Sequence, residues 1–240
     1  MTKIFSKKEL HLVIIWENGR YKEIEILNLI SKKFELVEKY KISWNKSLFA
    51  KNLTTFYGTN LPPNSEKEKH VGKGEFLLII FYDHEPRYGY VETSRGLEKV
   101  NVNIFSCKEK FRTLTGGGHK IHSTNSRLET NHDLTLLLGI NYKDYEKKLK
   151  KKLNGSKKDK NIITNTPNNV IGVNGWESLK QLFYVMNSSL DYVVLRNFES
   201  LPKNKFSKEH GDIDFLVKDL NQSVYITNAQ KLYKKKYKLN

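Results

Sequence analysis

The 240-residue chain has one cysteine and no long hydrophobic run, and both shortages restrict the kind of protein it can be. Cys107 alone excludes an intramolecular disulfide and a cysteine-rich zinc site, so we expect a reducing compartment. The longest apolar run, residues 76–82, is far too short to cross a bilayer, and residues 1–10 lack the apolar segment of a secretory signal. We therefore expect a cytoplasmic protein without a membrane span.

Acidic residues are scarce relative to basic ones. The chain has 42 Lys and Arg residues against 26 Asp and Glu, a net charge of +16. This charge attracts polyanions, so nucleotides, nucleic acid and an acidic membrane face are candidate partners. Lysine and asparagine are abundant throughout, and a biased genome composition explains the excess equally well. The composition also leaves open a homo-oligomer.

Strand and helix patterns alternate along the first half of the chain. The run at 76–82 is apolar throughout, which is typical of a strand in the middle of a sheet. Residues 87–103 fit either a helix or a strand, and the pattern does not decide. The remaining elements that we predict are strands at 11–16 and 35–44, helices at 21–34 and 47–57, a polar loop at 60–74 that contains His70, and a short helix or loop at 105–114.

Residues 116–138 combine glycines, two histidines and a helix start signal. We interpret Gly116–Gly118 as a flexible turn, because a phosphate-binding loop would follow a strand rather than precede one. His119 and His122 lie on a short strand, and Ser126 and Glu129 form a capping-box pattern that opens a leucine-rich helix. An imidazole delivered to a helix N-terminus could accept a phosphoryl group. The alternative is a partly buried histidine that is hydrogen-bonded to a neighbour.

The order of elements predicts an α+β fold, a ferredoxin-like antiparallel sheet of about four strands with helices on one face. Residues 10–140 resemble the nucleoside diphosphate kinases. The resemblance rests on the first strand ending in Glu17-Asn18-Gly19, Phe34-Glu35-Leu36-Val37 at the start of the second strand, Phe56-Tyr57, FLLII at 76–80 and KIHSTNSRLETNHDLTLLL at 120–138.

The resemblance implies that His122 is the phosphorylated residue and that Asp133 orients it. We accordingly expect the His122 imidazole to face an open, cationic hollow. Trp16 stands where the family has a phosphate-binding lysine, and Ser123-Thr124-Asn125 replaces the core of the family's histidine motif. The nucleotide-binding residues implied by the resemblance are Tyr57, Arg95, Arg112 and His119.

Residues 144–170 change to a lysine-rich segment followed by Gly, Ser, Asn and Pro, which is typical of a basic linker. It would separate a first domain at 1–143 from a second module at 171–240. This module begins with a helix pattern at 176–186 and a strand at 191–196. Asp212 and Asp214 then lie on one face of a strand, because side chains alternate along a strand.

The Gly-Asp-Ile-Asp pattern at 211–214 resembles the DNA polymerase β type nucleotidyltransferases, especially those of polysaccharide biosynthesis. The resemblance implies a partial α/β module in which Asp212 and Asp214 hold Mg²⁺ against a nucleoside triphosphate. Arg196-Asn197-Phe198 stands where that family has a glycine pair or Gly-Ser. The family's third carboxylate lies on a later strand, so we expect a longer parent protein.

Three hypotheses follow, and the sequence alone does not establish that the protein is an enzyme. The first is a nucleotide-binding phosphoryl-transfer protein with His122 as phospho-acceptor. The second is a Mg²⁺-dependent nucleotidyltransferase that uses Asp212 and Asp214. The third is a non-catalytic basic module that binds nucleotides or nucleic acid.

Overall fold

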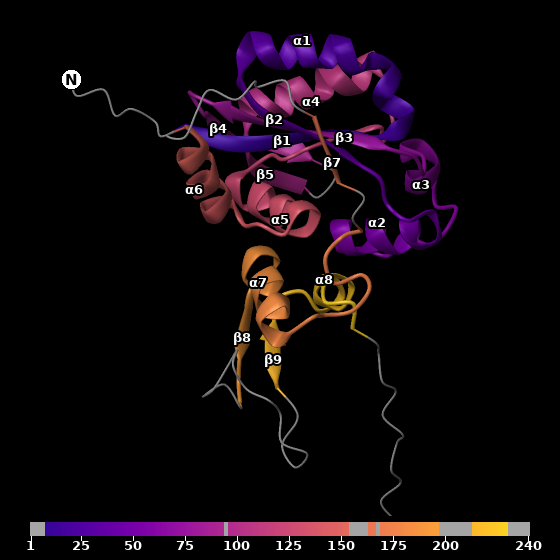
Figure 1. The fold of residues 1–240 in the computed structure, drawn as a ribbon, viewed down its shortest axis with the longest axis vertical. Coiled ribbons are helices and arrows are strands. Elements are labelled where there is room, and N and C mark those ends of the chain that lie inside the picture. The colour runs from indigo at the N-terminus through magenta and orange to yellow at the C-terminus, as the bar shows by residue number, and fades with distance from the viewer. Residues whose placement is uncertain (1–7, 94–95, 154–162, 167–168, 197–212, 230–240) are drawn as a thin grey trace, which may run out of the picture.

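The computed structural model describes residues 8–93, 96–153, 163–166, 169–196 and 213–229. These residues form a mixed α+β structure built on antiparallel strand pairs (Figure 1). The strands are β1 (Glu9–Ile15), β2 (Glu35–Ile42), β3 (Phe76–Asp83), β4 (Tyr88–Thr93), β5 (Gly96–Asn101), β6 (Ile121–Ser123), β7 (Ile163–Thr166), β8 (Tyr192–Val194) and β9 (Phe215–Val217). The helices are α1 (Glu23–Lys33), α2 (Phe49–Tyr57), α3 (Glu66–Val71), α4 (Val102–Leu114), α5 (Arg127–Leu138), α6 (Tyr142–Leu153), α7 (Leu179–Ser189) and α8 (Leu220–Ile226), with short 3-10 helices η1 (Glu17–Lys22) and η2 (Lys46–Leu48).

Among the described helices, none has the length and apolar character needed to span a bilayer. A location in the cytoplasm stays a prediction.

β3 lies in the middle of a five-stranded sheet whose order is β6-β1-β3-β2-β7. All eight of its residues are buried, which confirms the predicted central strand. β1 and β2 pair antiparallel with β3 on its two sides, and β6 pairs antiparallel with β1. β7 runs parallel to β2 at the edge.

Helices cover both faces of the sheet, so the prediction of helices on one face is wrong. Leu12 and Ile14 of β1 pack with residues of α2, α5 and α6, whereas Val13 and Ile15 pack with residues of α1 and α4. Figure 1 shows the same division, with α1 and α4 on one side of the sheet and α2, α5 and α6 on the other. The physical reason is that β1 and β3 are apolar on both faces, which needs two cores.

Two segments contain more regular structure than the sequence indicates. The predicted polar loop at 60–74 contains α3, which Ser65 caps by accepting a hydrogen bond from the Glu68 backbone N–H at 3.4 Å. The undecided stretch at 87–103 is the β4–β5 hairpin followed by the start of α4. α4 runs for 13 residues and is therefore a full helix rather than a short one.

The segment interpreted as a linker carries α6 and β7. The Glu38 carboxylate of β2 accepts hydrogen bonds from Tyr40 and Tyr145 and pairs with Lys152, so α6 is held against the sheet. After β7, the Asn169 side chain accepts hydrogen bonds from the Asn45 backbone N–H (2.9 Å) and the Asn52 side chain (3.0 Å). The domain boundaries at 143 and 170 remain predictions.

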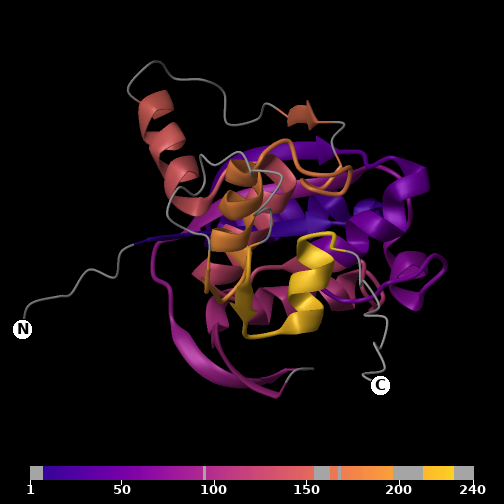
Figure 2. The same ribbon diagram turned by 90° about the horizontal axis from the view of Figure 1, so that it is seen from below.

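The described part of the second module packs directly on the first. α7 lies against α5 and α8 lies against α2, as Figures 1 and 2 show. Val185 and Ile226 are buried in the same core cluster as β1 and α5. Inside the module the rings of Phe183, Tyr192 and Phe215 form an aromatic group between α7 and the β8–β9 hairpin.

Candidate active site around His122

His122 is the central residue of β6 and is fixed by pairing with Ile14 of β1. The chain then enters α5 through the predicted capping box. Ser126 Oγ accepts a hydrogen bond from the Glu129 backbone N–H at 3.2 Å, and the Glu129 carboxylate accepts one from the Asn125 backbone N–H at 2.6 Å. The strand and the capped helix therefore hold His122 and the first turn of α5 in a fixed relation.

His122 and Asp133 form a buried pair. His122 Nε2 lies 2.7 Å from Asp133 Oδ2, and the exposed fractions of the two side chains are 10% and 2%. Burial lowers the pKa of His122 to about 3, and the positive charges of Lys108, Lys67 and Arg112 act in the same direction. Burial raises the pKa of Asp133 to about 7. The imidazole is therefore neutral at pH 7.

His122 lines a cavity of about 400 Å³. Its other ring nitrogen, Nδ1, forms no hydrogen bond with any described residue. The rings of Phe56 and Tyr57 lie edge-on to the imidazole, with centroids 5.4 and 5.6 Å away. With Nε2 held by Asp133, Nδ1 is the nitrogen whose lone pair a ligand could reach.

The cavity is more acidic than we expected. Among the described residues, its lining contains the acidic residues Glu98, Glu129, Asp133 and Asp191 but only one lysine, Lys99. The other lining residues include the end of α7 and Gln222 of α8, so both modules build the wall. The expected cationic hollow is therefore wrong for the cavity itself.

A group of basic side chains lies near Tyr57 and the glycine turn. We call Lys67, His70, Arg112 and His119 the cationic cluster. Lys67 Nζ lies 3.2 Å from the centre of the Tyr57 ring, and the rings of His70 and His119 are 5.4 Å apart. Burial lowers the pKa of His119, and the charges of the other three members add to this effect.

Two buried polar atoms of the cationic cluster lack a hydrogen-bond partner. Within the described part of the chain, Arg112 Nε and His70 Nδ1 are these two atoms. Buried polar groups are normally satisfied, and guanidinium and imidazole N–H groups are donors suited to an anion. Gly118 permits the arrangement: its φ is +75°, and a Cβ there would approach the His70 ring to 3.3 Å.

The structure brings some of the predicted site residues together. His122, Asp133 and Tyr57 line one cavity, while Arg112 and His119 belong to the cationic cluster. Arg95 and Asp212 lie outside the described residues.

Asp214 lies elsewhere. It pairs with Arg196 beside the β8–β9 hairpin and does not line the cavity. No group of three or more His, Cys, Asp or Glu side chains within the described ranges could hold a metal. A magnesium site at Asp212 and Asp214 stays a prediction.

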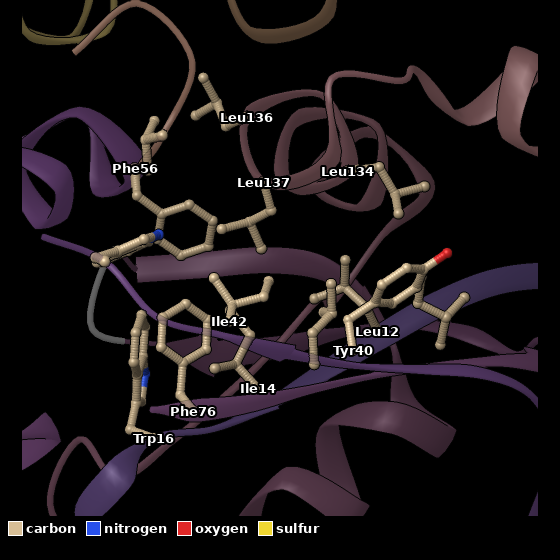
Figure 3. Packing of buried hydrophobic residues seen from close by; sticks show 14 of the residues in the cluster. Leu12, Ile14, Trp16, Tyr40, Ile42, Phe56, Phe76, Leu134, Leu136 and Leu137 are labelled. Carbon is tan, nitrogen blue, oxygen red and sulfur yellow. The ribbon is translucent and has the colours of Figure 1, made fainter. Parts of the chain in front are cut away.

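Trp16 belongs to the core. Its side chain is fully buried and packs on Phe76 and Trp44, with ring centroids 4.5 and 5.4 Å away. Figure 3 shows Trp16 and Phe76 together beneath Phe56. Trp16, at the position where the nucleoside diphosphate kinases have a lysine, therefore contributes core packing and no positive charge.

Sequence reasoning missed the residues that come from distant segments. Lys67 was hidden in the predicted loop, although Ser65 and Glu68 have the spacing of a capping box and signalled a helix there. The contribution of α7 and Gln222 to the cavity had no local signal, because it arises from packing between distant segments.

No model of a known protein family matches the chain, and no curated protein matches it either.

Proposed function

We propose that this chain is a nucleotide-binding phosphoryl-transfer protein with a ferredoxin-like, nucleoside diphosphate kinase-like fold in which His122 accepts the phosphoryl group. The observation that carries the proposal is the neutral, buried imidazole held through Nε2 by Asp133, with Nδ1 unbonded at a cavity wall. A nucleophilic histidine needs a neutral ring and a group that fixes its tautomer.

The strand arrangement supports the fold part of the proposal. In a ferredoxin-like sheet two strand–helix–strand units interleave, so that the first and third sheet strands lie side by side in the centre. Here β1 and β3 are central, with β6 and β2 outside them, and these neighbouring pairs are antiparallel. β7 extends this arrangement at one edge.

The chemistry needs few parts. The Nδ1 lone pair attacks the terminal phosphorus of a magnesium-bound nucleoside triphosphate, the N–P bond forms, and the bond to the nucleoside diphosphate oxygen breaks. Asp133 accepts the hydrogen bond from Nε2–H and stabilises the positive charge that develops on the ring. We assign the contacts to phosphate oxygens to Arg112 and Lys67, whose positive charges act on the His122 ring. Lys67 Nζ lies over the Tyr57 ring, and that ring packs edge-on against His122.

Incubation of the full chain with Mg²⁺ and γ-labelled ATP tests this proposal. We expect an acid-labile, base-stable label on the protein and none from α-labelled ATP. His122→Gln should abolish the label, whereas His84→Gln, a change at an exposed histidine, should leave it intact. An unlabelled wild-type protein, or equal labelling of the His122→Gln variant, would contradict the proposal.

Two alternatives remain proposals with their own outcomes. Label transfer from an α-labelled nucleotide to a sugar phosphate, abolished by Asp212→Asn, would favour the nucleotidyltransferase. Salt-sensitive nucleotide or nucleic acid binding without any labelling would favour the non-catalytic module. The solvent-exposed lysines of α6 are a candidate surface for nucleic acid in that case.

A further inference from the structure

Side chains of opposite charge lie around His122. Lys67 and Arg112 of the cationic cluster carry positive charges that act on the ring. The cavity that His122 lines also has the acidic residues Glu98, Glu129 and Asp191 in its wall. A phosphate group is attracted to the cluster and repelled by the carboxylates, so the cluster suits the phosphate-bearing donor and the acidic part of the cavity suits an uncharged ligand.

The second module supplies unused hydrogen-bonding groups to the cavity. Ser189 Oγ, at the end of α7, is buried and has no hydrogen-bond partner among the described residues. The Gln222 side chain of α8 lines the same cavity, and its amide forms no hydrogen bond within the described ranges. With His122, three uncharged polar side chains from separate elements line the same cavity.

The chemistry of these groups defines the ligand. Hydroxyl, amide and imidazole groups exchange hydrogen bonds with hydroxyls, and carboxylates accept hydrogen bonds from hydroxyls but repel phosphates. The cavity volume of about 400 Å³ falls in the range of small-molecule sites. The rings of Phe56 and Tyr57 supply an apolar surface beside His122.

We propose that the cavity between α5 and α7 binds the phosphoryl acceptor, and that this acceptor is an uncharged, hydroxyl-rich molecule such as a polyol or a sugar. Its role as acceptor rests on the proposed function. An acceptor hydroxyl oxygen attacks the phosphorus on Nδ1, the O–P bond forms, and the N–P bond breaks with its electron pair returning to the ring. The hydroxyl proton passes to the Glu129 carboxylate on the cavity wall and then to water.

Binding to the full chain is measured by calorimetry with ribitol and glucose as probes, and with ribitol 5-phosphate and glucose 6-phosphate beside them. At least one neutral probe should bind with a Kd of about 1 mM or tighter, and its phosphate ester should bind about ten-fold more weakly. Ser189→Ala and Gln222→Ala should each raise the Kd of the neutral probe by about five-fold or more. Asn221 is exposed and precedes Gln222 on α8, so Asn221→Ala is the control and should leave the Kd of the probe unchanged.

The two proposals fail in different ways. His122→Gln should abolish γ-phosphate labelling and, because it alters one of the three groups that line the probe site, weaken the neutral probe by no more than the two cavity variants do. Gln222→Ala should weaken probe binding while labelling persists. The acceptor proposal is overturned if neither neutral probe binds, if a phosphate ester binds more tightly than its parent, or if the two cavity variants bind like wild type. Missing label with intact probe binding would overturn only the phosphoryl-transfer proposal.

Discussion

Replacing Asp133 by Asn tests the buried pair most directly, because the size of the side chain is kept while the charge is removed. An amide at this position can donate to His122 Nε2, which moves the ring proton to Nδ1 and removes the nucleophilic lone pair. Loss of a positioned acid–base group typically lowers the rate by a factor of about 10²–10⁴, which corresponds to roughly 3–5 kcal/mol of activation free energy. We therefore expect the rate of labelling by γ-labelled ATP to fall by about that factor.

The same substitution should affect stability much less. The hydrogen bond to His122 changes from a charge-assisted one to a neutral one, which costs about 1 kcal/mol. Burial raises the pKa of Asp133 from 3.8 to about 7, so the ionised carboxyl costs a few kcal/mol, on the order of 1.4 per pKa unit. These terms oppose each other and leave a net change within about 2 kcal/mol.

The sign of the pH dependence follows from the raised pKa of Asp133. Between about pH 4 and pH 7 the folded state binds more protons at this carboxyl than the unfolded state, so its contribution to stability is lost as pH rises. In urea unfolding, the free energy of unfolding of Asp133→Asn relative to that of wild type should be higher at pH 8 than at pH 5. Asp144→Asn, at a half-exposed acid paired with Lys147, is the control. Labelling within about three-fold of wild type, or a larger destabilisation at pH 8 than at pH 5, would refute the reasoning.

Further predictions concern single side chains and are checked by chemical unfolding. Burial lowers the pKa of His122, so the unfolded chain binds more protons there below about pH 6.5, and the His122 contribution to stability is lost as pH decreases, opposite to the Asp133 contribution. The free energy of unfolding of His122→Gln relative to wild type should therefore be higher at pH 5 than at pH 8. Tyr145→Phe removes a hydrogen bond to the Glu38 carboxylate and should cost about 1–3 kcal/mol; no loss would show that this contact is not stabilising. Trp16→Ala should cost about 3–5 kcal/mol through the cavity it leaves, and a loss below about 1 kcal/mol would contradict its core position. Gly139→Ala should cost more than about 1 kcal/mol, because its φ is +69° and the added Cβ would lie 3.0 Å from Ile171.

Local patterns predicted the elements well because they report local physics. The apolar run at 76–82 became the buried centre of the sheet, and the spacing of Ser126 and Glu129 marked the start of α5. Periodicity was less accurate about faces. Ile24 has the helical spacing of Leu27, Ile30 and Phe34, yet it is 75% exposed, while Ile26 is fully buried. The contact between α1 and the sheet decides the face, and that contact is not local.

The site was predicted only where its parts are close in sequence. His122 and Asp133 are joined by one strand and one capped helix, so a motif could relate them. The charges that surround them come from α3, α4, β5 and the segment between α7 and β8. The distances between these segments cannot be read from the sequence. The total charge of +16 favoured a cationic hollow, whereas the local balance of the cavity is set by a few acidic side chains.

The contacts of β7 and Asn169 have a practical consequence for cleaved protein. β7 is hydrogen-bonded along β2, and Asn169 accepts hydrogen bonds from Asn45 and Asn52, so residues 163–166 and 169 are anchored to the front half without the intervening peptide. A single protease cut between residues 153 and 163 should leave two fragments that co-elute. Separately expressed halves should then reassociate by complementation, and the halves could be exchanged between variants.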